Sequence, residues 1–258
     1  MFKVVIPARF GSTRLPGKPL RMIAGKTMLE RVYRQAVNAA IGEVLVATDD
    51  ARISQAATAF GGRALMTDSD HPSGTDRLAQ VATREGWDDS WIVINVQGDE
   101  PLLPPENIAQ VAHLLAAAPD CVMATLMTPV TDWPDFLDPN VVKVVSAAGR
   151  ALYFSRSPLP WHRQLASAGP QSLDPWSGAF RHLGIYAYRV STLKALATLE
   201  PSLLERTERL EQLRVLEQGW SIAIANAAAV PGPGVDTEED LARVTALIEA
   251  SGVCGQAD

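Results

Sequence analysis

The sequence has little of what several protein classes require. It contains two cysteines, Cys121 and Cys254, which lie far apart and outside any Cys-x-x-Cys pattern, so neither a disulfide framework nor a cysteine-based metal site is expected. No apolar run approaches the roughly eighteen residues that span a membrane, and the first residues lack the apolar core and cleavage site of a signal peptide. We therefore expect a soluble, cytoplasmic protein that does not bind a membrane.

The sequence also lacks an excess of basic residues. It has 23 Lys and Arg against 29 Asp and Glu, a formal net charge of −6, whereas proteins that bind nucleic-acid polymers usually carry a basic surface. We therefore expect no nucleic acid as a partner, but a single nucleotide in a locally basic pocket is compatible with this charge. Hydrophobic residues make up 47% of the 258 positions, which is enough for a substantial core.

Short apolar runs alternate with amphipathic helical patterns in the first half of the chain. The runs at 3–8, 43–50 and 91–96 predict buried strands, and the patterns at 27–40 and 51–60 predict helices. This alternation is typical of βαβ units, so we expect an α/β fold with three α/β/α layers and a mostly parallel, mixed sheet. In such sheets ligands bind at the carboxyl ends of the strands, where the loop after the first strand lies.

The pattern changes after about residue 128. Residues 141–154 predict a β-hairpin, and we expect about 129–190 to form an inserted antiparallel β subdomain within a single domain of residues 1–258. Further along, 208–219 and 236–250 predict helices. Four apolar residues of the C-terminal helix are expected to face inward: Leu241, Val244, Leu247 and Ile248.

The loop after the first predicted strand reads PARFGSTRLPGKPL and carries Arg9, Arg14 and Lys18. It is not a Walker loop, because five residues separate Gly11 from Gly17 and Lys18 is followed by a proline, which offers neither a hydroxyl group nor a backbone N–H. The dinucleotide fingerprint G-x-G-x-x-G is also absent here. Arginine and lysine side chains bind phosphate oxygens directly, so the loop indicates a phosphate site; the alternative is an ordinary solvated loop.

These residues are part of a longer resemblance that runs from residue 3 to about 248. The segments IPARFGSTRLPGKPL, VATDD, HPSGTDR, NVQGDEP, FSR, RHLGIYAYR, LEQLR and GVDTEEDL resemble the 3-deoxy-manno-octulosonate cytidylyltransferase (CMP-Kdo synthetase) family. The resemblance implies a Rossmann-like nucleotidyltransferase fold and transfer of CMP from CTP to 3-deoxy-D-manno-octulosonate (Kdo), with release of pyrophosphate, for lipopolysaccharide biosynthesis. It also implies a homodimer and an insert that serves sugar binding and dimerisation.

The resemblance further implies a Mg²⁺ ion as cofactor, bound by Asp99 and Asp236. It places four residues at the triphosphate: Arg9, Ser12, Arg14 and Lys18. The implied catalytic residues are Arg9, Arg14, Lys18 and Asp99. From the residues alone, the alternative for Asp99 is a turn residue, and Asp236 is better explained as a helix cap. A Thr237–Asp240 capping box would leave the Asp236 carboxylate free.

Most of the residues assigned to cytosine and to the acceptor sugar acid are assigned from the resemblance. It implies that cytosine is bound by Ala8, Ser73, Arg77 and Gln97. It implies that the sugar acid is bound by Arg156, His182, Tyr186, Glu211 and Gln212. Each set has a plain structural alternative: Ser73 as a helix cap, Arg77 as a surface charge, His182 as a core histidine, and Glu211 with Gln212 as a solvated helix face. Asp49 and Asp50 are expected to be structural turn residues or to lie behind the site.

Two other functions remain open at this point. The PAR-x-x-STRLPGK pattern is shared more loosely with CMP-sialate synthetases, so the acceptor could be a sialic-acid-like sugar or 8-amino-Kdo. A protein of another class, a nucleotide-binding module without catalysis, would also use the cationic loop. Such a module would bind CTP without releasing pyrophosphate.

Overall fold

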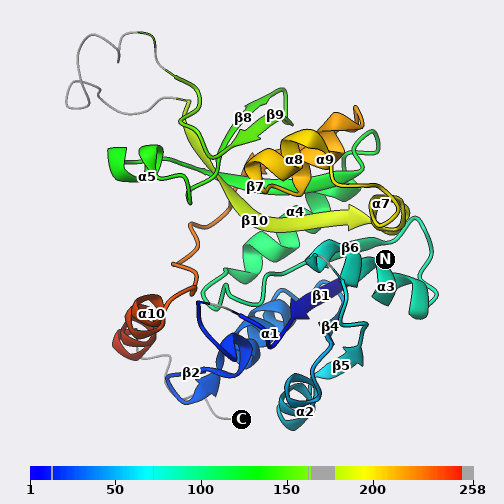
Figure 1. The fold of residues 1–258 in the computed structure, drawn as a ribbon, viewed down its shortest axis with the longest axis vertical. Helices are drawn as coiled ribbons and strands as arrows, with labels where there is room; N and C mark the ends of the chain where they lie inside the picture. The colour runs from blue at the N-terminus through cyan, green and yellow to red at the C-terminus, as the bar shows by residue number, and fades with distance from the viewer. Residues whose placement is uncertain (13, 72, 162, 164–177, 252–258) are drawn as a thin grey trace.

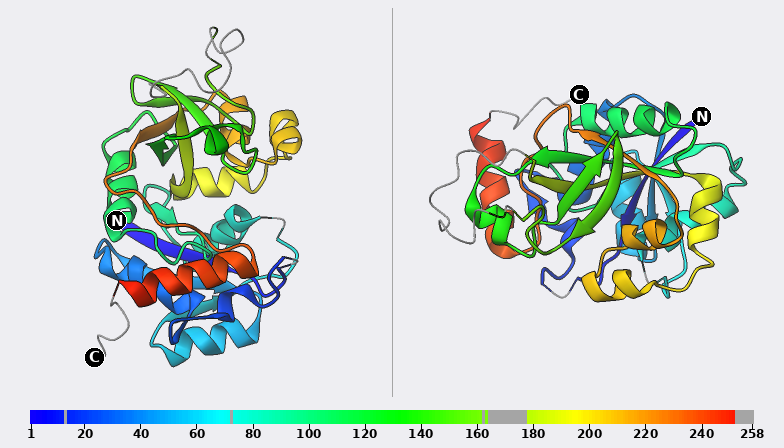
Figure 2. Two further views of the ribbon diagram at one scale, coloured as in Figure 1. Left: turned by 90° about the vertical axis from the view of Figure 1, so that its left-hand side faces the viewer. Right: turned by 90° about the horizontal axis from the view of Figure 1, so that it is seen from above.

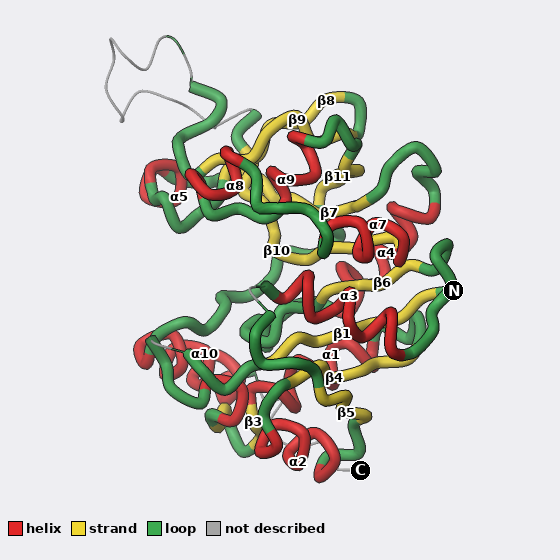
Figure 3. Tube along the Cα trace, turned by 45° about the vertical axis from the view of Figure 1, so that its right-hand side comes forward, coloured by secondary structure: helices red, strands yellow, loops and turns green. Residues whose placement is uncertain are grey.

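The computed structural model describes residues 1–12, 14–71, 73–161, 163 and 178–251. Within these residues nine strands form one mixed sheet, with helices on both of its faces (Figure 1). Figure 3 shows the strands as a ladder, in the order β5-β4-β1-β6-β10-β7-β11-β9-β8. The structure thus has the α/β class and the mixed sheet that the sequence predicts. No helix in the described part of the chain is long and apolar enough to cross a membrane.

The first half of the chain forms the parallel part of the sheet. Its strands are β1 (Phe2–Ala8), β4 (Glu43–Thr48), β5 (Arg63–Met66) and β6 (Ile92–Asn95). Strand β1 lies between β4 and β6 and is parallel to both. Its apolar side chains are buried on both faces, which explains why the run is continuously hydrophobic. The short strands β2 (Met22–Ile23) and β3 (Lys26–Thr27) form a separate ribbon.

Helices cover the two faces of this sheet and bury two apolar clusters. One face packs against α1 (Met28–Asn38), α2 (Ala51–Ala59) and α4 (Pro105–Ala116). The other packs against α3 (Gly74–Arg84), α7 (Val190–Leu196) and α9 (Gln212–Glu217). These layers leave the carboxyl ends of β1 and β6 uncovered, so the loops that follow these strands are available for a ligand.

The second half of the chain extends the sheet. Strand β10 (Phe180–Arg189) is antiparallel to both β6 and β7 (Met123–Pro129). Beyond β7 come β11 (Ile222–Asn226), β9 (Arg150–Ser155) and β8 (Lys143–Ala147), and β8 pairs again with the start of β10. Strands β8 and β9 form the expected hairpin. Helix α5 (Trp133–Leu137) precedes them. The division into a main part and an insert at 129–190 stays a prediction, and β10 belongs to the main sheet.

Two local predictions about helices are wrong. The pattern at 208–219 predicted one helix, but α8 (Leu203–Glu208) ends at Arg209, which adopts a left-handed conformation with φ of 53°, and α9 starts at Gln212. In α10 (Glu238–Ala250), Leu247 is exposed, while the other three predicted residues are buried. The Pro- and Trp-rich sequence at about 157–180 has little periodicity and predicts a long loop, and most of this segment lies outside the described residues.

Helix α10 packs against the N-terminal part of the chain rather than against the sheet. Its buried residues Leu241, Val244 and Ile248 form a third apolar cluster with Leu15, Ile23, Met28 and Val235. Figure 2 shows the helix, in red, lying across the part of the molecule that contains the first strands. This packing brings the start of α10, and with it Asp236, close to the loop after β1.

A buried ion pair joins α8 and α9. The Arg214 guanidinium donates from Nε and Nη2 to the two carboxylate oxygens of Glu205, at 2.7 and 2.6 Å, and both residues are buried. Its Nη1 donates to the carbonyl oxygens of Leu196 and Leu199. The pair therefore fixes the short helices that carry the chain towards residues 209–212.

We predict that Arg214→Leu lowers the free energy of unfolding by about 3–5 kcal/mol, because it leaves the Glu205 carboxylate buried without its partner. The matched control is Lys194→Leu, which removes the exposed pair of Lys194 with Asp89 and should cost less than about 1 kcal/mol. Urea denaturation of both variants measures the difference. Equal losses in the two variants would contradict the prediction.

Candidate active site

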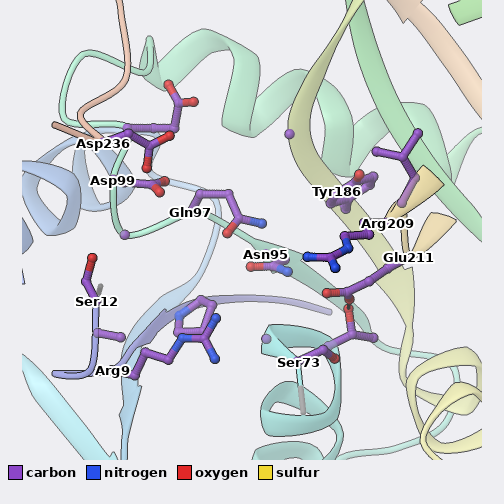
Figure 4. A pocket seen from close by; sticks show the side chains of 18 of the residues that line it. Arg9, Ser12, Ser73, Asn95, Gln97, Asp99, Tyr186, Arg209, Glu211 and Asp236 are labelled. Atoms are coloured by element: carbon purple, nitrogen blue, oxygen red, sulfur yellow. Dashed lines mark hydrogen bonds between the residues drawn. The ribbon is translucent and has the colours of Figure 1, made fainter. Parts of the chain in front are cut away.

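A cavity of about 880 Å³ opens where the loops after β1 and β6 meet β10 and the α8–α9 turn. Figure 4 shows Asp99 and Asp236 side by side at one end and Tyr186, Arg209 and Glu211 at the other, with Gln97 and Asn95 between them. The predicted site residues that line the cavity are Ala8, Arg9, Ser12, Arg14, Lys18, Ser73, Arg77, Gln97, Asp99, His182, Tyr186, Glu211, Gln212 and Asp236. The fold thus brings together all but one of the residues named from the sequence.

The loop after β1 is held by its own backbone while its cationic side chains face the cavity. Gly17 has a φ of 66°, and a Cβ atom there would lie 3.2 Å from the ring of Phe10, so glycine suits both the turn and the close approach. The Leu15 amide donates to the Ser12 hydroxyl oxygen, and the Lys18 amide donates to the Leu15 carbonyl oxygen. These hydrogen bonds hold the turn at residues 15–18, and the Arg9 and Arg14 side chains are exposed.

Lys18 lies between the two predicted metal carboxylates. Its Nζ donates to Asp99 Oδ2 and to Asp236 Oδ1, each at 2.7 Å, and Arg14 Nη2 lies 3.1 Å from the same Asp236 oxygen. Burial by itself would lower the pKa of Lys18, but the charges and hydrogen bonds of the two carboxylates outweigh it and raise the pKa above its usual value. Lys18 is therefore an ammonium ion at neutral pH.

The Asp236 carboxylate is free for this contact because the cap of α10 is made by other groups. Thr237 and Asp240 form the capping box predicted from the sequence, and Asp240 also accepts a hydrogen bond from the Asp236 amide. The Val235 amide donates to the Asp99 carbonyl oxygen at 3.0 Å. The backbone thus holds the two acidic residues next to each other.

These two carboxylates suit a hard divalent cation. A cation, the Lys18 ammonium, already lies between them. Among the described residues no three His, Cys, Asp or Glu side chains converge as a metal cage, so the protein would supply two ligands and leave the others to phosphate oxygens and water. Mg²⁺ at phosphate-transfer sites is commonly bound in this way. The residues present therefore fit the predicted ion.

Ser73 and Arg77 were both predicted to bind cytosine, each with a structural alternative. The alternative is correct for Ser73 and wrong for Arg77. The Ser73 hydroxyl caps α3 by accepting from the Asp76 amide, as its structural alternative stated, while the residue also lines the cavity. Arg77 is buried rather than a surface charge, and donates to Asp49 Oδ2 at 3.0 Å and to the Thr67 hydroxyl. Asp50 caps α2, so both aspartates after β4 are structural, as expected.

His182, at the acceptor end, is a neutral imidazole. Its Nε2 lies 2.8 Å from Thr125 Oγ1, and that hydroxyl also lies 2.8 Å from the carbonyl oxygen of Ile185. A carbonyl oxygen only accepts, so the Thr125 hydroxyl donates to it and Nε2 must carry the proton given to Oγ1. Burial lowers the pKa of His182 to about 3. Its Nδ1 is therefore an acceptor at neutral pH.

The other residues predicted to bind the sugar acid differ in exposure: Gln212 is buried, Tyr186 is half-buried and Glu211 is exposed. Thr75 Oγ1 donates to Glu211 Oε2 at 2.7 Å, and burial raises the pKa of Glu211. Burial likewise raises the pKa of Tyr186. Gln212 is buried, and its Nε2 has no hydrogen-bond partner among the described residues. The interpretation as a solvated helix face is therefore wrong for Gln212, whereas Glu211 is exposed, as that interpretation states.

Arg156 is the one predicted site residue that lies outside the cavity lining. Its Nε donates to the Glu208 carbonyl oxygen at 2.7 Å, and its Nη1 donates to the Pro139 carbonyl oxygen at 2.9 Å. The guanidinium is thus engaged by backbone groups behind the acceptor end. Its role in binding sugar stays a prediction that the present geometry does not favour.

The cavity lining also includes residues that the sequence analysis did not single out, among them Asn95, Glu100, Arg181 and Arg209. Asn95 had a visible signal, since it is a polar residue at the end of a buried apolar strand. Glu100 follows the metal carboxylate directly, and burial, with the charge of Asp99 next, raises its pKa to about 7. Arg209 gave no signal, because it lies in a pattern that predicts an uninterrupted helix.

Comparison with known proteins agrees with this geometry. The family model described as "Cytidylyltransferase" matches residues 3–223. A 3-deoxy-manno-octulosonate cytidylyltransferase of Thioalkalivibrio sulfidiphilus is 53% identical over 251 residues, which cover 96% of this chain and 99% of the relative. One of Hahella chejuensis is 51% identical and covers 97% and 98%.

A solved structure has the same fold over almost the whole chain. It is the CMP:2-keto-3-deoxy-manno-octonic acid synthetase complexed with CTP, with a TM-score of 0.87 and 43% identity, and the match covers 97% of this chain and 99% of that one. The family model and the full-length relatives therefore agree on the family of this chain. The chain belongs to the 3-deoxy-manno-octulosonate cytidylyltransferase family.

Proposed function

We infer that this protein transfers CMP from CTP to 3-deoxy-manno-octulosonate. The sugar hydroxyl oxygen bonds to the α-phosphorus, the bond from that phosphorus to the bridging oxygen of the β-phosphate breaks, pyrophosphate leaves, and the hydroxyl proton is released. One observation carries the inference: a single cavity has cations and two carboxylates at one end and side chains that can hydrogen-bond to a sugar at the other. The relatives of similar length and name support the same reaction.

At the nucleotide end, the proposal gives the triphosphate to the side chains of the loop after β1. Arg9 and Arg14 are exposed and extend into the cavity, so they can follow the phosphates and stabilise the charge that builds on the leaving pyrophosphate. Asp99 and Asp236 would hold Mg²⁺, which when bound neutralises and orients phosphate oxygens. Ser73, Arg77 and Gln97 line the wall on which we place the base.

At the acceptor end, the proposal separates hydrogen bonding from charge neutralisation. A neutral His182 accepts a hydrogen bond through Nδ1 but cannot balance the carboxylate of a sugar acid. Arg181 and Arg209 also line the cavity, and Arg209 makes no ion pair with any residue the structure describes. We therefore assign the sugar carboxylate to the arginines and the sugar hydroxyls to His182, Tyr186 and the Glu211–Gln212 pair.

We also propose a homodimer, as expected from the resemblance. Large apolar side chains are exposed in the second half of the chain, on Leu137 of α5, Leu152 of β9 and Leu203 of α8. Exposed apolar groups of this kind are candidates for burial when two copies associate. The association would bury them without covering the loop after β1.

The acceptor assignment predicts the outcome of a substrate screen. The purified chain with CTP and Mg²⁺ should release pyrophosphate with 3-deoxy-manno-octulosonate, and more slowly or not at all with 8-amino-Kdo or a sialic acid. Pyrophosphate release measured for each acid gives the order of preference. Turnover confined to another acid would overturn the acceptor, and CTP binding without turnover on any acid would favour a binding module.

The metal assignment predicts the effect of removing either carboxylate. Asp99→Asn and Asp236→Asn should each lower kcat/KM by about 10²- to 10³-fold, the usual cost of losing one preorganised group that stabilises transition-state charge, and should raise the Mg²⁺ concentration needed for half-maximal rate. Asp120→Asn is the control, since it removes an exposed carboxylate paired with Arg150. A wild-type Mg²⁺ response in either site variant would refute this role.

The division of the cavity predicts which substrate each arginine serves. Arg14→Ala should raise the KM for CTP by about 10- to 100-fold and change that for the sugar acid little, because one charge-assisted hydrogen bond contributes about 1.5–3 kcal/mol. Arg209→Ala should do the reverse. Initial rates with each substrate varied in turn measure both constants. Parallel effects of the two variants on both substrates would contradict the division.

A further inference from the structure

The Lys18 ammonium occupies the position between the two carboxylates that the proposed function assigns to a metal ion. The lysine side chain is only 13% exposed, against 39% for Asp99 and 46% for Asp236. Its two hydrogen bonds are equal at 2.7 Å. The two carboxylates use two of the three ammonium donors, so Lys18 in this position can offer at most one donor to a phosphate oxygen.

The need for such a cation follows from the repulsion between the two carboxylates. The backbone holds them together through the hydrogen bond from the Val235 amide to the Asp99 carbonyl oxygen, so they cannot separate freely when no metal is bound. Two like charges held at this distance destabilise each other. The ammonium removes that repulsion in the chain without ligands.

We propose that Lys18 is a built-in substitute for the metal: together with Arg14 at Asp236 it balances the charge of Asp99 and Asp236 in the nucleotide-free chain, competes with divalent cations for them, and moves to the phosphates when the nucleotide binds. Metal and nucleotide therefore bind cooperatively. The inference rests on the proposed function, because it takes the two aspartates as metal ligands and a nucleoside triphosphate as the group that attracts the lysine.

The local structure allows this exchange without rearranging the loop. Lys18 is the first residue of the short 3₁₀ turn η1 (Lys18–Leu20). This turn is held by the hydrogen bond from the Lys18 amide to the Leu15 carbonyl oxygen and by the buried Pro19. Only the flexible four-carbon side chain has to swing. A lysine suits this role better than an arginine, since its ammonium is a compact point charge whose donors rotate freely.

The exchange has a consequence for equilibrium binding. A site that is open to metal for only a fraction of the time has its apparent affinity reduced by that fraction. If the ammonium fills the site about 90% of the time, metal binding without nucleotide is weakened about tenfold. By reciprocity, the nucleotide strengthens metal binding by the same factor by which the metal strengthens nucleotide binding.

The experiment measures Mn²⁺ binding to the nucleotide-free chain, from the electron paramagnetic resonance signal of the free ion. Lys18→Met should bind Mn²⁺ about tenfold more tightly than the wild type, because the competitor is gone. Lys3→Met is the matched control: Lys3 is 14% exposed and paired with Glu43, outside the cavity, so its loss removes one positive charge and should leave Mn²⁺ affinity unchanged. Adding Asp99→Asn to Lys18→Met should abolish the gain.

Each outcome bears on the proposal. Mn²⁺ affinity in Lys18→Met equal to or below that of the wild type overturns the exchange, as does an equal gain in Lys3→Met. Circular dichroism confirms folding, and Lys18→Gln replaces Lys18→Met if the latter is unfolded. Pyrophosphate release by the wild type is assayed on the same preparation: turnover without a gain in affinity rejects only the exchange, whereas a gain without turnover on any sugar acid rejects the proposed function.

Discussion

The contact of Lys18 with Asp99 and Asp236 is the constraint on which the rest of the site depends. It joins the start, middle and end of the chain, since the lysine is 81 residues from one partner and 218 from the other. It exists only because α10 packs its apolar face against the segment after β1. A helix that contributes no side chain to the cavity thus decides whether two carboxylates meet. The ion pair between Lys18 and Asp236 in turn restrains the chain that leads into α10.

The two ends of the cavity are built on different physical principles. At the nucleotide end the backbone is fixed, but the exposed arginines stay adaptable, which suits a ligand whose charge is spread over many oxygens. At the other end, burial lowers the pKa of His182 and raises those of Tyr186 and Glu211, which favours the neutral form of each. Under the proposed function, His182 and Tyr186 would recognise hydroxyl positions, and arginines would balance the charge of the acid.

Much of the fold follows from local pattern, because buried parallel strands and amphipathic helices have distinct periodicities. The place of β10 does not, since pairing with β6 and β7 is a long-range choice that its own residues do not encode. In the site, the Thr237–Asp240 box could be read directly and correctly left Asp236 free. The burial of Arg77 could not be read from the sequence, because it depends on Asp49, a residue 28 positions away that follows β4.

The break at Arg209 shows why the acceptor end was the least predictable part. Residues 208–219 are good helix formers, so local propensity favours one helix, and tertiary contacts override it. Arg156 is among those contacts: it binds the Glu208 carbonyl oxygen, while Arg214 anchors the following turn to Glu205. These two arginines hold the backbone on either side of Arg209, whose own guanidinium then faces the cavity. The motif that contains Arg156 therefore identifies the region next to the cavity. The arginine that lines the cavity there is Arg209 and not Arg156.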